Sequence, residues 1–288
     1  MEPKIRFKGF EGEWKTSTIG EIAPLQRGYD LPTNSVISGT IPVVYSNGIL
    51  RFHNEGKCQA PAIITGRSGT IGKFTYIDHG EYWPHNTSLW VTTFHNNYPR
   101  FVYYFFQNVG FEKYATGSGV PTLNRNDIHK HIESIPSNKE EQQAIASYFT
   151  SLDSLISAAT SRLASLKQMK AASLQAMFPQ EGEAVPKIRF KGFEGEWKKV
   201  KADSIFKTFN EKNRPDLPVL SATQDRGMVT RESIGYNIFH DTSNEATYKH
   251  ILPGQFVIHL RSFQGGFAHS EIEGIASPAY TIMDFKNK

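Results

Sequence analysis

At 288 residues, the chain is long enough for two domains of ordinary size, each with its own hydrophobic core. The net charge of +4 is compatible with a polyanionic partner without identifying one, and the single cysteine, Cys58, excludes a disulfide framework and a multi-cysteine zinc site and favours a reducing compartment. The sequence has no run of about eighteen apolar residues and no secretory N-terminus, so we expect no membrane span and a cytoplasmic protein.

The first segment of the chain is repeated later in the sequence. Residues 3–15 read PKIRFKGFEGEWK, and residues 186–198 read the same thirteen letters, 183 positions further on. Thirteen consecutive identities do not arise by chance, so the chain contains a duplicated unit. We expect the segment to open each unit as an edge strand and a turn, with Trp14 packed inward.

The next stretch is typical of β-strands. Residues 41–52, IPVVYSNGILRF, predict a hairpin because Asn-Gly is a strong turn signal between two apolar runs. The run AIITGRSGTIGKFTYI predicts two strands joined by a loop over 66–72, and residues 82–93 predict one further strand. Residues 100–111, RFVYYFFQNVGF, are apolar nearly all round, which predicts a buried helix or strand, and of the two we expect the helix.

The loop that follows Gly66 has the composition of a DNA-contacting loop. GRSGTIGK fails as a nucleotide-binding P-loop, because five residues rather than four separate its outer glycines and Phe74 stands where Ser or Thr belongs. A tight turn explains the glycines but not the polar side chains. A guanidinium, hydroxyls and open backbone N–H groups suit DNA phosphates and guanine edges. We therefore predict DNA contacts by Arg67, Ser68, Gly69, Thr70 and Lys73.

Two other short segments are candidates for the same role. Asn86 stands at a strand entrance, where an asparagine is either a turn former or a reader of a base. The segment 117–124, GSGVPTLN, is small and polar and is followed by Arg125. It is either a plain connector ahead of a helix or a phosphate contact made through Ser118, Arg125 and backbone amides.

A long helix is predicted over 137–180. Apolar residues recur there at alternating spacings of three and four, the pattern of a helix packed lengthwise on another helix. This seam consists of Ile145, Phe149, Leu152, Ile156, Ala159, Leu163 and Leu166. Ser137 and Glu140 predict a capping box at the start, and Phe178-Pro179 predicts the end. Such a helix, about 60 Å long at 1.5 Å per residue, is either a surface helix under a domain or a spacer between modules; the repeated segment favours the spacer.

Residues 181–288 follow the order of the first unit. Residues 217–222 predict a strand, and QFVIHLRSFQGGFAHSEI aligns with AIITGRSGTIGKFTYI at an offset of 194 residues. The alignment predicts DNA contacts by Arg261, Ser262 and Gln264, and it pairs Lys288 with Phe94. We therefore expect a second unit that is truncated relative to the first and has no long helix of its own.

Together these elements predict an α+β fold in which two mixed α/β domains are joined by a long coiled-coil-type helix. The predicted boundaries are 1–136 for the first domain, 137–180 for the helix and 181–288 for a partial second domain. The histidines lack metal-ligand spacing, and the sequence contains no dinucleotide fingerprint, no nucleophile elbow and no methyltransferase motif. We predict no catalytic residues and no metal site.

Several short motifs occur in an order that resembles one protein family. They are Trp14-x4-Ile19-Gly20, SNGI at 46–49, GRSGTIG at 66–72, GSGVPTLN at 117–124, Pro136-x4-Glu141-Gln142-x2-Ile145, LPVLSATQDRG at 217–227 and SPAY at 277–280. In this order they resemble the specificity (S) subunit of type I restriction-modification systems, over essentially the whole chain.

The resemblance implies a non-catalytic subunit with two target-recognition domains, each of which reads one half of a bipartite double-stranded DNA site. It implies that long helices set the spacing and dock two modification (methyltransferase) subunits, with restriction subunits outside them. S-adenosylmethionine, ATP and magnesium would then belong to the partner subunits. The family pattern also has a second GSG-P-LN stretch and a second long helix antiparallel to the first, which this sequence does not contain.

Two alternative functions remain open on the sequence alone. The chain can be a non-catalytic two-module coiled-coil scaffold that binds another protein, or an enzyme with a nucleotide-handling loop, which the failed P-loop spacing disfavours. A homodimer through the seam of the long helix is also expected, because the sequence supplies no second helix to cover it. Strong salt dependence of binding would distinguish the DNA-binding function from the scaffold.

Overall fold

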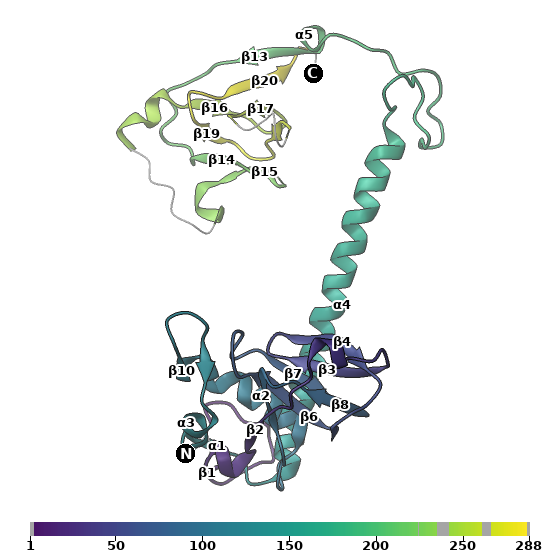
Figure 1. Ribbon diagram of the computed structural model, residues 1–288. Helices are drawn as coiled ribbons and strands as arrows, with labels where there is room; N and C mark the ends of the chain where they lie inside the picture. Colours follow the sequence, from purple (N-terminus) through teal and green to yellow (C-terminus); the bar gives the residue numbers. More distant parts are fainter. Residues whose placement is uncertain (1–2, 224, 235–241, 261–265, 287–288) are drawn as a thin grey trace. The chain divides into compact units, whose positions relative to one another are not determined.

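The computed structural model describes residues 3–223, 225–234, 242–260 and 266–286 (Figure 1). The chain divides into unit 1, Met1–Met169, and unit 2, Lys170–Lys288, and the division falls inside the longest helix, α4 (Lys139–Met177). Both units contain several small sheets. The fold is therefore the predicted mixture of α and β structure with one long helix.

Unit 1 is built on two four-stranded sheets. In sheet order, the first consists of β2 (Leu25–Arg27), β9 (Ser88–Val91), β6 (Ala62–Gly66) and β7 (Phe74–Ile77), all antiparallel. The second consists of β4 (Gly48–His53), β3 (Ile41–Tyr45), β8 (Glu81–Pro84) and β5 (Cys58–Gln59), in which β3 and β8 are parallel. The hairpin predicted at 41–52 and the two strands predicted around the 66–72 loop are confirmed.

Residues 82–93 form two strands rather than the one predicted. β8 ends at Pro84, the N–H of Ser88 donates to the carbonyl of His85 at 2.9 Å to close a turn, and β9 begins at Ser88. The two strands belong to different sheets, since β8 pairs with β3 and β5 whereas β9 pairs with β2 and β6. The apolar run is long because it passes from one sheet to the other.

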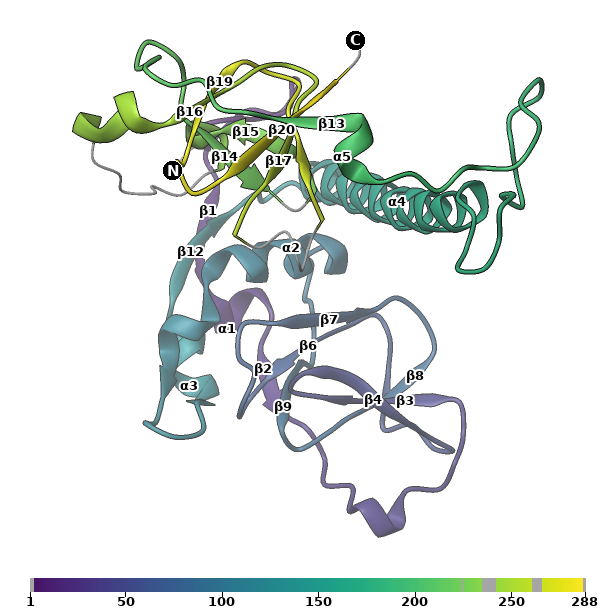
Figure 2. The ribbon, with the colours of Figure 1, turned by 90° about the horizontal axis from the view of Figure 1, so that it is seen from above.

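Helix α2 (Pro99–Val109) confirms the buried helix predicted at 100–111. Proline opens it, and Gly110 in the left-handed region, at φ 76°, ends it. Its buried side chains share one core with the first sheet: Phe101, Val102, Phe106 and Val109 from α2, and Ile63, Leu89 and Val91 from the sheet. Figure 2 shows α2 beside the β6–β7 side of that sheet.

The remaining elements of unit 1 are short. They are β1 (Lys15–Thr18), α1 (Ile19–Ile22), η1 (Thr33–Ser35), η2 (Phe111–Tyr114), β10 (Ala115–Thr116), β11 (Thr122–Leu123), α3 (Arg125–His129) and β12 (Ile132–Ile135). β1 pairs antiparallel with β12, which places the start of the chain beside the residues that precede α4. The repeated segment reaches strand conformation only at Lys15, because Gly9 and Gly12, at φ 99° and 82°, turn the backbone before β1. The predicted edge strand is therefore wrong for most of its length.

Helix α4 begins later than the capping box at Ser137 predicts. Its cap is Asn138, whose Oδ1 accepts from the N–H groups of Glu140 at 2.7 Å and Glu141 at 3.1 Å. The carbonyl of Asn138 also accepts the N–H of Gln142 at 3.2 Å, so Ser137 lies outside the helix. The helix ends at Met177, directly before Phe178-Pro179, as predicted. No described helix is both long enough and apolar enough to cross a membrane.

Two buried polar residues fasten the first turn of α4 to unit 1. The carboxylate of Glu141 accepts from Nε and Nη2 of Arg6, at 2.8 and 2.7 Å, and from Nε1 of Trp14 at 3.2 Å. The amide of Gln142 accepts from the backbone N–H of Tyr98 at 2.7 Å and donates to Oδ1 of Asn97 at 2.8 Å. The repeated segment at 3–15 therefore holds the start of α4 by a two-pronged ion pair.

The seam of α4 is buried only near the start of the helix. Ile145 packs against the core of unit 1, and Leu152 is half-buried. The side chains farther along are exposed, with Ile156 at 64%, Leu163 at 54% and Leu166 at 51%. An apolar stripe of this kind marks a surface that another element covers.

Unit 2 repeats the strand order of unit 1. Its main sheet consists of β13 (Phe206–Phe209), β20 (Thr281–Phe285), β17 (Phe256–Ile258) and β18 (Ala268–His269), in the order of β2, β9, β6 and β7. β17 and β18 begin 194 residues after β6 and β7. The internal alignment predicted from the sequence is therefore confirmed at the level of the sheet.

The other elements of unit 2 are paired strands and short helices. They are α5 (Ala202–Ile205), β14 (Leu220–Thr223), β15 (Gly227–Thr230), η3 (Arg231–Ile234), η4 (Thr242–Thr247), β16 (Lys249–Ile251) and β19 (Gly274–Ala276). The core of the unit consists of Leu220, Met228, Ile251, Val257, Ala268, Ala276 and Ile282. The described residues of unit 2 contain no helix that corresponds to α2.

Candidate nucleic-acid interface

The loop between β6 and β7 is joined to the turn between β8 and β9. The backbone N–H groups of Arg67 and Ser68 donate to the carbonyl of Thr87 at 2.8 and 3.2 Å. Nε of Arg67 donates to the carbonyl of Asn86 at 3.0 Å. Two candidate residues that are far apart in the sequence, Arg67 and Asn86, therefore lie side by side.

The segment that contains GSGVPTLN lies against the other side of the same loop. The N–H of Gly69 donates to the carbonyl of Pro121 at 2.9 Å, and the N–H of Leu123 donates to the carbonyl of Arg67 at 2.7 Å. The open backbone N–H groups predicted for this loop are therefore not open at Arg67, Ser68 and Gly69, because each donates within the protein. The loop and the GSGVPTLN segment can therefore contact DNA through side chains. Thr70 of the loop and Ser118 of the segment are both exposed.

The backbone of the loop is fixed tightly. A Cβ atom at Gly66 would lie 1.7 Å from the carbonyl oxygen of Thr70, so only glycine fits there. Nε of Arg67 is bound to Asn86, but its two Nη groups form no hydrogen bond with any residue that the structure describes. Nζ of Lys73 lies 3.4 Å from the carbonyl of Asn47, in the β3–β4 turn. The loop thus holds a half-buried guanidinium fork and an exposed ammonium group in a rigid frame.

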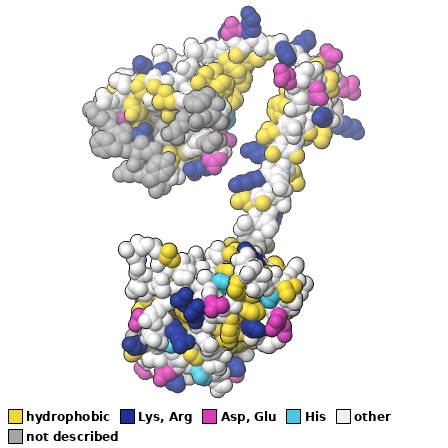
Figure 3. Space-filling model, in the orientation of Figure 1, with side chains coloured by type: hydrophobic (Ala, Val, Ile, Leu, Met, Phe, Trp, Pro, Cys, Tyr) yellow, Lys and Arg dark blue, Asp and Glu magenta, His cyan; other side chains and the backbone are white. Residues whose placement is uncertain are grey.

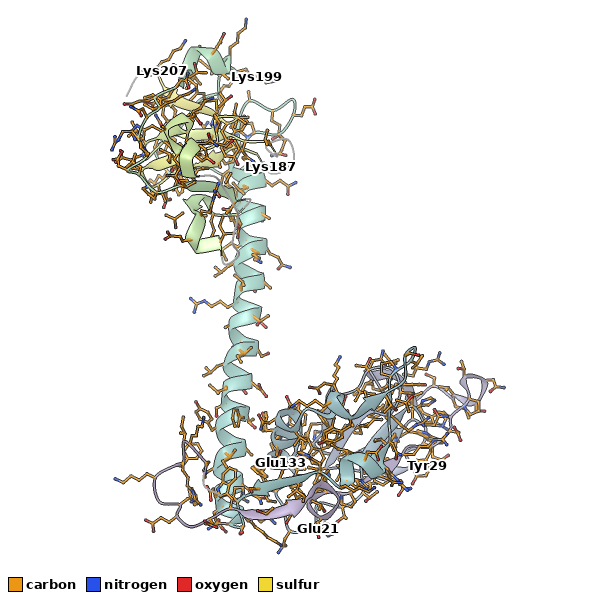
Figure 4. All side chains as sticks on the ribbon, turned by 90° about the vertical axis from the view of Figure 1, so that its left-hand side faces the viewer. Glu21, Tyr29, Glu133, Lys187, Lys199 and Lys207 are labelled. Carbon is orange, nitrogen blue, oxygen red and sulfur yellow. The ribbon has the colours of Figure 1, made fainter. Side chains whose placement is uncertain are left out.

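A second group of polar side chains extends this surface. Arg125 lines a hollow of about 550 Å³ together with Gln26, Arg27, Gly28, Tyr29 and Asp30. The amide of Asn86 donates to Oδ1 of Asp30, which also pairs with Arg27 at 3.3 Å. Asp30 therefore connects the turn that carries Asn86 with the hollow that carries Arg125. Figure 4 labels Tyr29 at an end of unit 1 away from α4.

Sequence reasoning missed Arg27, Tyr29 and Asp30. The available signal was the dipeptide Arg27-Gly28 followed by an aromatic and an acidic residue. Gly28 is required because a Cβ atom there would lie 2.2 Å from the carbonyl oxygen of His85. That close approach joins β2 to the β8–β9 turn, and it is invisible without the tertiary fold.

The charge of this surface comes from arginine and lysine rather than histidine. Burial lowers the pKa of His85 below its ordinary value, and burial together with nearby Arg125 lowers the pKa of His129. Nε2 of His129 also accepts the N–H of Leu25 at 2.8 Å, which requires the neutral form. The positive charges of this surface are therefore those of Arg27, Arg67, Lys73 and Arg125, and Asp30 contributes a negative charge beside Arg27. Figure 3 shows a group of lysine and arginine side chains on the face of unit 1 that it draws.

The DNA-contact candidates of unit 2 fall between β17 and β18 in the sequence. Arg261, Ser262 and Gln264 lie outside the described residues, so the structure describes only the flanking strands β17 and β18. Within the described ranges, no group of three or more His, Cys, Asp or Glu side chains is placed to hold a metal ion.

We call the 67–73 loop, the 85–87 turn and the 117–125 segment, with Arg27 and Tyr29, the candidate surface. Three loops that are distant in the sequence meet in it through backbone hydrogen bonds. A rigid set of guanidinium, ammonium, hydroxyl and amide groups can bind phosphate oxygens and the edges of bases.

Comparisons with known proteins bear on the fold and the family. The family model described as "Type I restriction modification DNA specificity domain" matches residues 11–168, a range that contains the whole candidate surface. A crystal structure of a type I restriction-modification system S subunit from M. genitalium aligns with 100% of this chain and 76% of that chain, at 14% identity and a TM-score of 0.63. A comparison with curated proteins finds no match.

Two further structures align at lower similarity. The HsdS subunit from Thermoanaerobacter tengcongensis aligns over 97% of this chain and 78% of that chain, at 13% identity and a TM-score of 0.43. A chain from a study of assembly and conformational transition of the type I R-M system aligns over 96% of this chain and 76% of that chain, at 12% identity and a TM-score of 0.46.

Proposed function

The chain belongs to the family of type I restriction-modification DNA specificity domains, and we propose that unit 1 reads one half of a bipartite DNA site through the candidate surface. The observation that carries this proposal is the meeting of three separate loops around Arg67, each fixed by backbone hydrogen bonds. Base readout requires side chains held in a fixed register, and a rigid frame supplies it.

Each group of the candidate surface has a role that follows from its chemistry. The two Nη groups of Arg67, which form no hydrogen bond with a described residue, suit the O6 and N7 acceptors of guanine. The amide of Asn86 suits a base edge if it exchanges its bond with Asp30. Lys73, Thr70, Ser118 and Arg125 suit phosphate oxygens. Phosphate contacts position the protein, and the arginine and the amide distinguish sequences.

We further propose that the chain is a non-catalytic subunit of a larger complex. Modification subunits dock on the long helix, restriction subunits join outside them, and S-adenosylmethionine, ATP and magnesium act in those partners. The helix is 39 residues long and is exposed along most of its length, which supports a docking role for it. A cytoplasmic location follows from this proposal, because that is where the DNA substrate lies.

We expect Arg67→Ala to weaken DNA binding by about 5- to 150-fold. A bidentate arginine–guanine contact contributes about 1–3 kcal/mol, and about 1.4 kcal/mol corresponds to a factor of ten. Fluorescence anisotropy with double-stranded DNA that carries the site measures the change at one salt concentration. A salt titration then tests for phosphate contacts, since log affinity falls by about 0.9 per contacted phosphate per decade of salt.

Arg162→Ala is the matched control, because it removes the same charge from an exposed position of α4. We expect its affinity to stay close to that of the unchanged chain. Equal affinities for the two variants would remove the 67–73 loop from the DNA interface. A DNA affinity that does not change with salt concentration would favour a protein-binding scaffold instead.

A further inference from the structure

The first copy of the repeated segment is a receptor for a carboxylate at the start of a helix. Arg6 donates two hydrogen bonds to Glu141, the third residue of α4, while its Nη1 donates to the carbonyl of Gly12 at 2.6 Å. Trp14 donates a third bond to the same carboxylate at 3.2 Å. Phe7 packs edge-on against Tyr148, two turns along the helix, with ring centroids 5.8 Å apart.

The second copy has the same shape. Nη1 of Arg189, the counterpart of Arg6, donates to the carbonyl of Gly195 at 2.6 Å, as Arg6 does to Gly12. Gly192 and Gly195 have φ values of 94° and 85°, against 99° and 82° for Gly9 and Gly12. The receptor is therefore formed in both copies, and in the second its arginine is already oriented by Gly195.

The second receptor holds no carboxylate among the described residues. The structure describes no side-chain partner for Nε or Nη2 of Arg189, the two atoms that in Arg6 bind Glu141. Trp197 is 46% exposed and Phe193 is 70% exposed, whereas their counterparts Trp14 and Phe10 are half-buried. Among the described residues, a helix start contacts the first copy and none contacts the second.

An apolar cavity adjoins the second receptor. The second copy of the repeated segment lies on the last turns of α4. The N–H of Ile188 donates to the carbonyl of Ala176 at 3.0 Å, and the ring centroids of Trp197 and Phe178 are 5.6 Å apart. The cavity measures about 660 Å³ and is lined by Leu174, Met177, Phe178, Ile188, Phe193 and Trp197, among others. Lys187, labelled in Figure 4, directly precedes Ile188, whose N–H is bound to this end of α4.

We propose that residues 186–198, with the end of α4, form a docking site for the first turns of a second α-helix of the α4 type. The occupant carries an asparagine cap, a glutamate at the third helical position and an aromatic side chain seven residues later. Its glutamate is bound by Arg189 and Trp197, and its aromatic side chain enters the apolar cavity. An identical sequence binds such a helix start elsewhere in the chain, which identifies the occupant by its chemistry.

A labelled peptide that contains residues 136–152 of this chain tests the proposal in the absence of DNA. We expect the peptide to bind the full chain, and we expect Glu141→Ala in the peptide to weaken binding by about 10- to 150-fold. A hydrogen bond to a charged group is worth about 1.5–3 kcal/mol, and this change removes such bonds. Because the change is in the peptide, the folding of the protein is not affected.

Variants of the full chain locate the site. Arg189→Ala is expected to weaken binding as much as the peptide change does, and Lys187→Ala, which removes the same charge from the same segment, is expected to have little effect. Fluorescence anisotropy measures each affinity. Failure to bind at millimolar peptide, equal binding of the two peptides, or binding that is lost in Arg6→Ala but kept in Arg189→Ala would overturn the proposal. None of these results bears on DNA recognition by unit 1.

Discussion

Replacing Glu141 by alanine lowers the free energy of unfolding of unit 1 by about 3–5 kcal/mol, because it breaks a buried ion pair and removes every hydrogen bond that the carboxylate accepts. Glu141 is 1% exposed, and its carboxylate accepts three hydrogen bonds from Arg6 and Trp14. Arg6, whose guanidinium loses this carboxylate in the variant, has a side-chain exposure of only 17%. Urea unfolding followed by circular dichroism measures the loss.

The neighbouring Glu140 provides the control for this experiment. It is exposed and also lies in the first turn of α4, so Glu140→Ala removes the same charge near the helix N-terminus and should cost no more than about 1 kcal/mol. The double variant Arg6→Ala/Glu141→Ala should be more stable than the sum of the single losses predicts, since it removes both charges of the pair. Equal unfolding midpoints for Glu141→Ala and Glu140→Ala would show that the pair does not hold α4 to unit 1.

The second large effect concerns the exposed seam of α4. We expect the purified chain to form a dimer in which two α4 helices pair antiparallel and bury Ile156, Leu163 and Leu166, which are all more than half exposed in one chain. Leu152→Glu/Leu163→Glu places charges in that seam and should convert the dimer completely to a monomer. Light scattering measures the mass of the unchanged chain and of the variant, each at a concentration of tens of micromolar.

Ser154→Glu/Ser165→Glu is the matched control, because each serine lies two residues beyond a seam leucine and therefore on the opposite face of the helix. This variant should remain a dimer. The two-fold symmetry of the dimer predicts a palindromic, gapped DNA site that two copies of unit 1 read. A monomer that is unchanged by the leucine substitutions would rule the dimer out.

Local patterns predicted most of the fold correctly. The hairpin at 41–52, the buried helix at 100–111 and the end of α4 before Phe178-Pro179 each rest on a signal within a few neighbouring residues. The errors have two causes, a tertiary one for the run 82–93 and a local one for the helix cap. The run 82–93 divides because its halves join different sheets. The cap was misplaced by one residue because Ser137 and Asn138 are both favourable cap residues, and Asn138 makes the bonds.

The candidate site was predictable in its parts but not in its assembly. Composition singled out the 66–72 loop, Asn86 and the GSGVPTLN segment, but their contact depends on backbone hydrogen bonds from Arg67, Ser68 and Gly69 that no local pattern contains. The same bonds occupy the N–H groups that the sequence left open for DNA. Arg27 and Asp30 enter the site only because Gly28 allows β2 to approach the β8–β9 turn. The repeated segment was visible at once, whereas its role as a carboxylate receptor required the positions of Arg6 and Glu141.

The most direct test of DNA recognition is a map of methylated bases in cells that carry the complete modification system, with and without the gene for this chain. The proposed function predicts a gapped sequence motif that is methylated only when the gene is present, and whose methylation falls in the Arg67→Ala strain but not in the Arg162→Ala strain. A methylation map that is the same with and without the gene would contradict it.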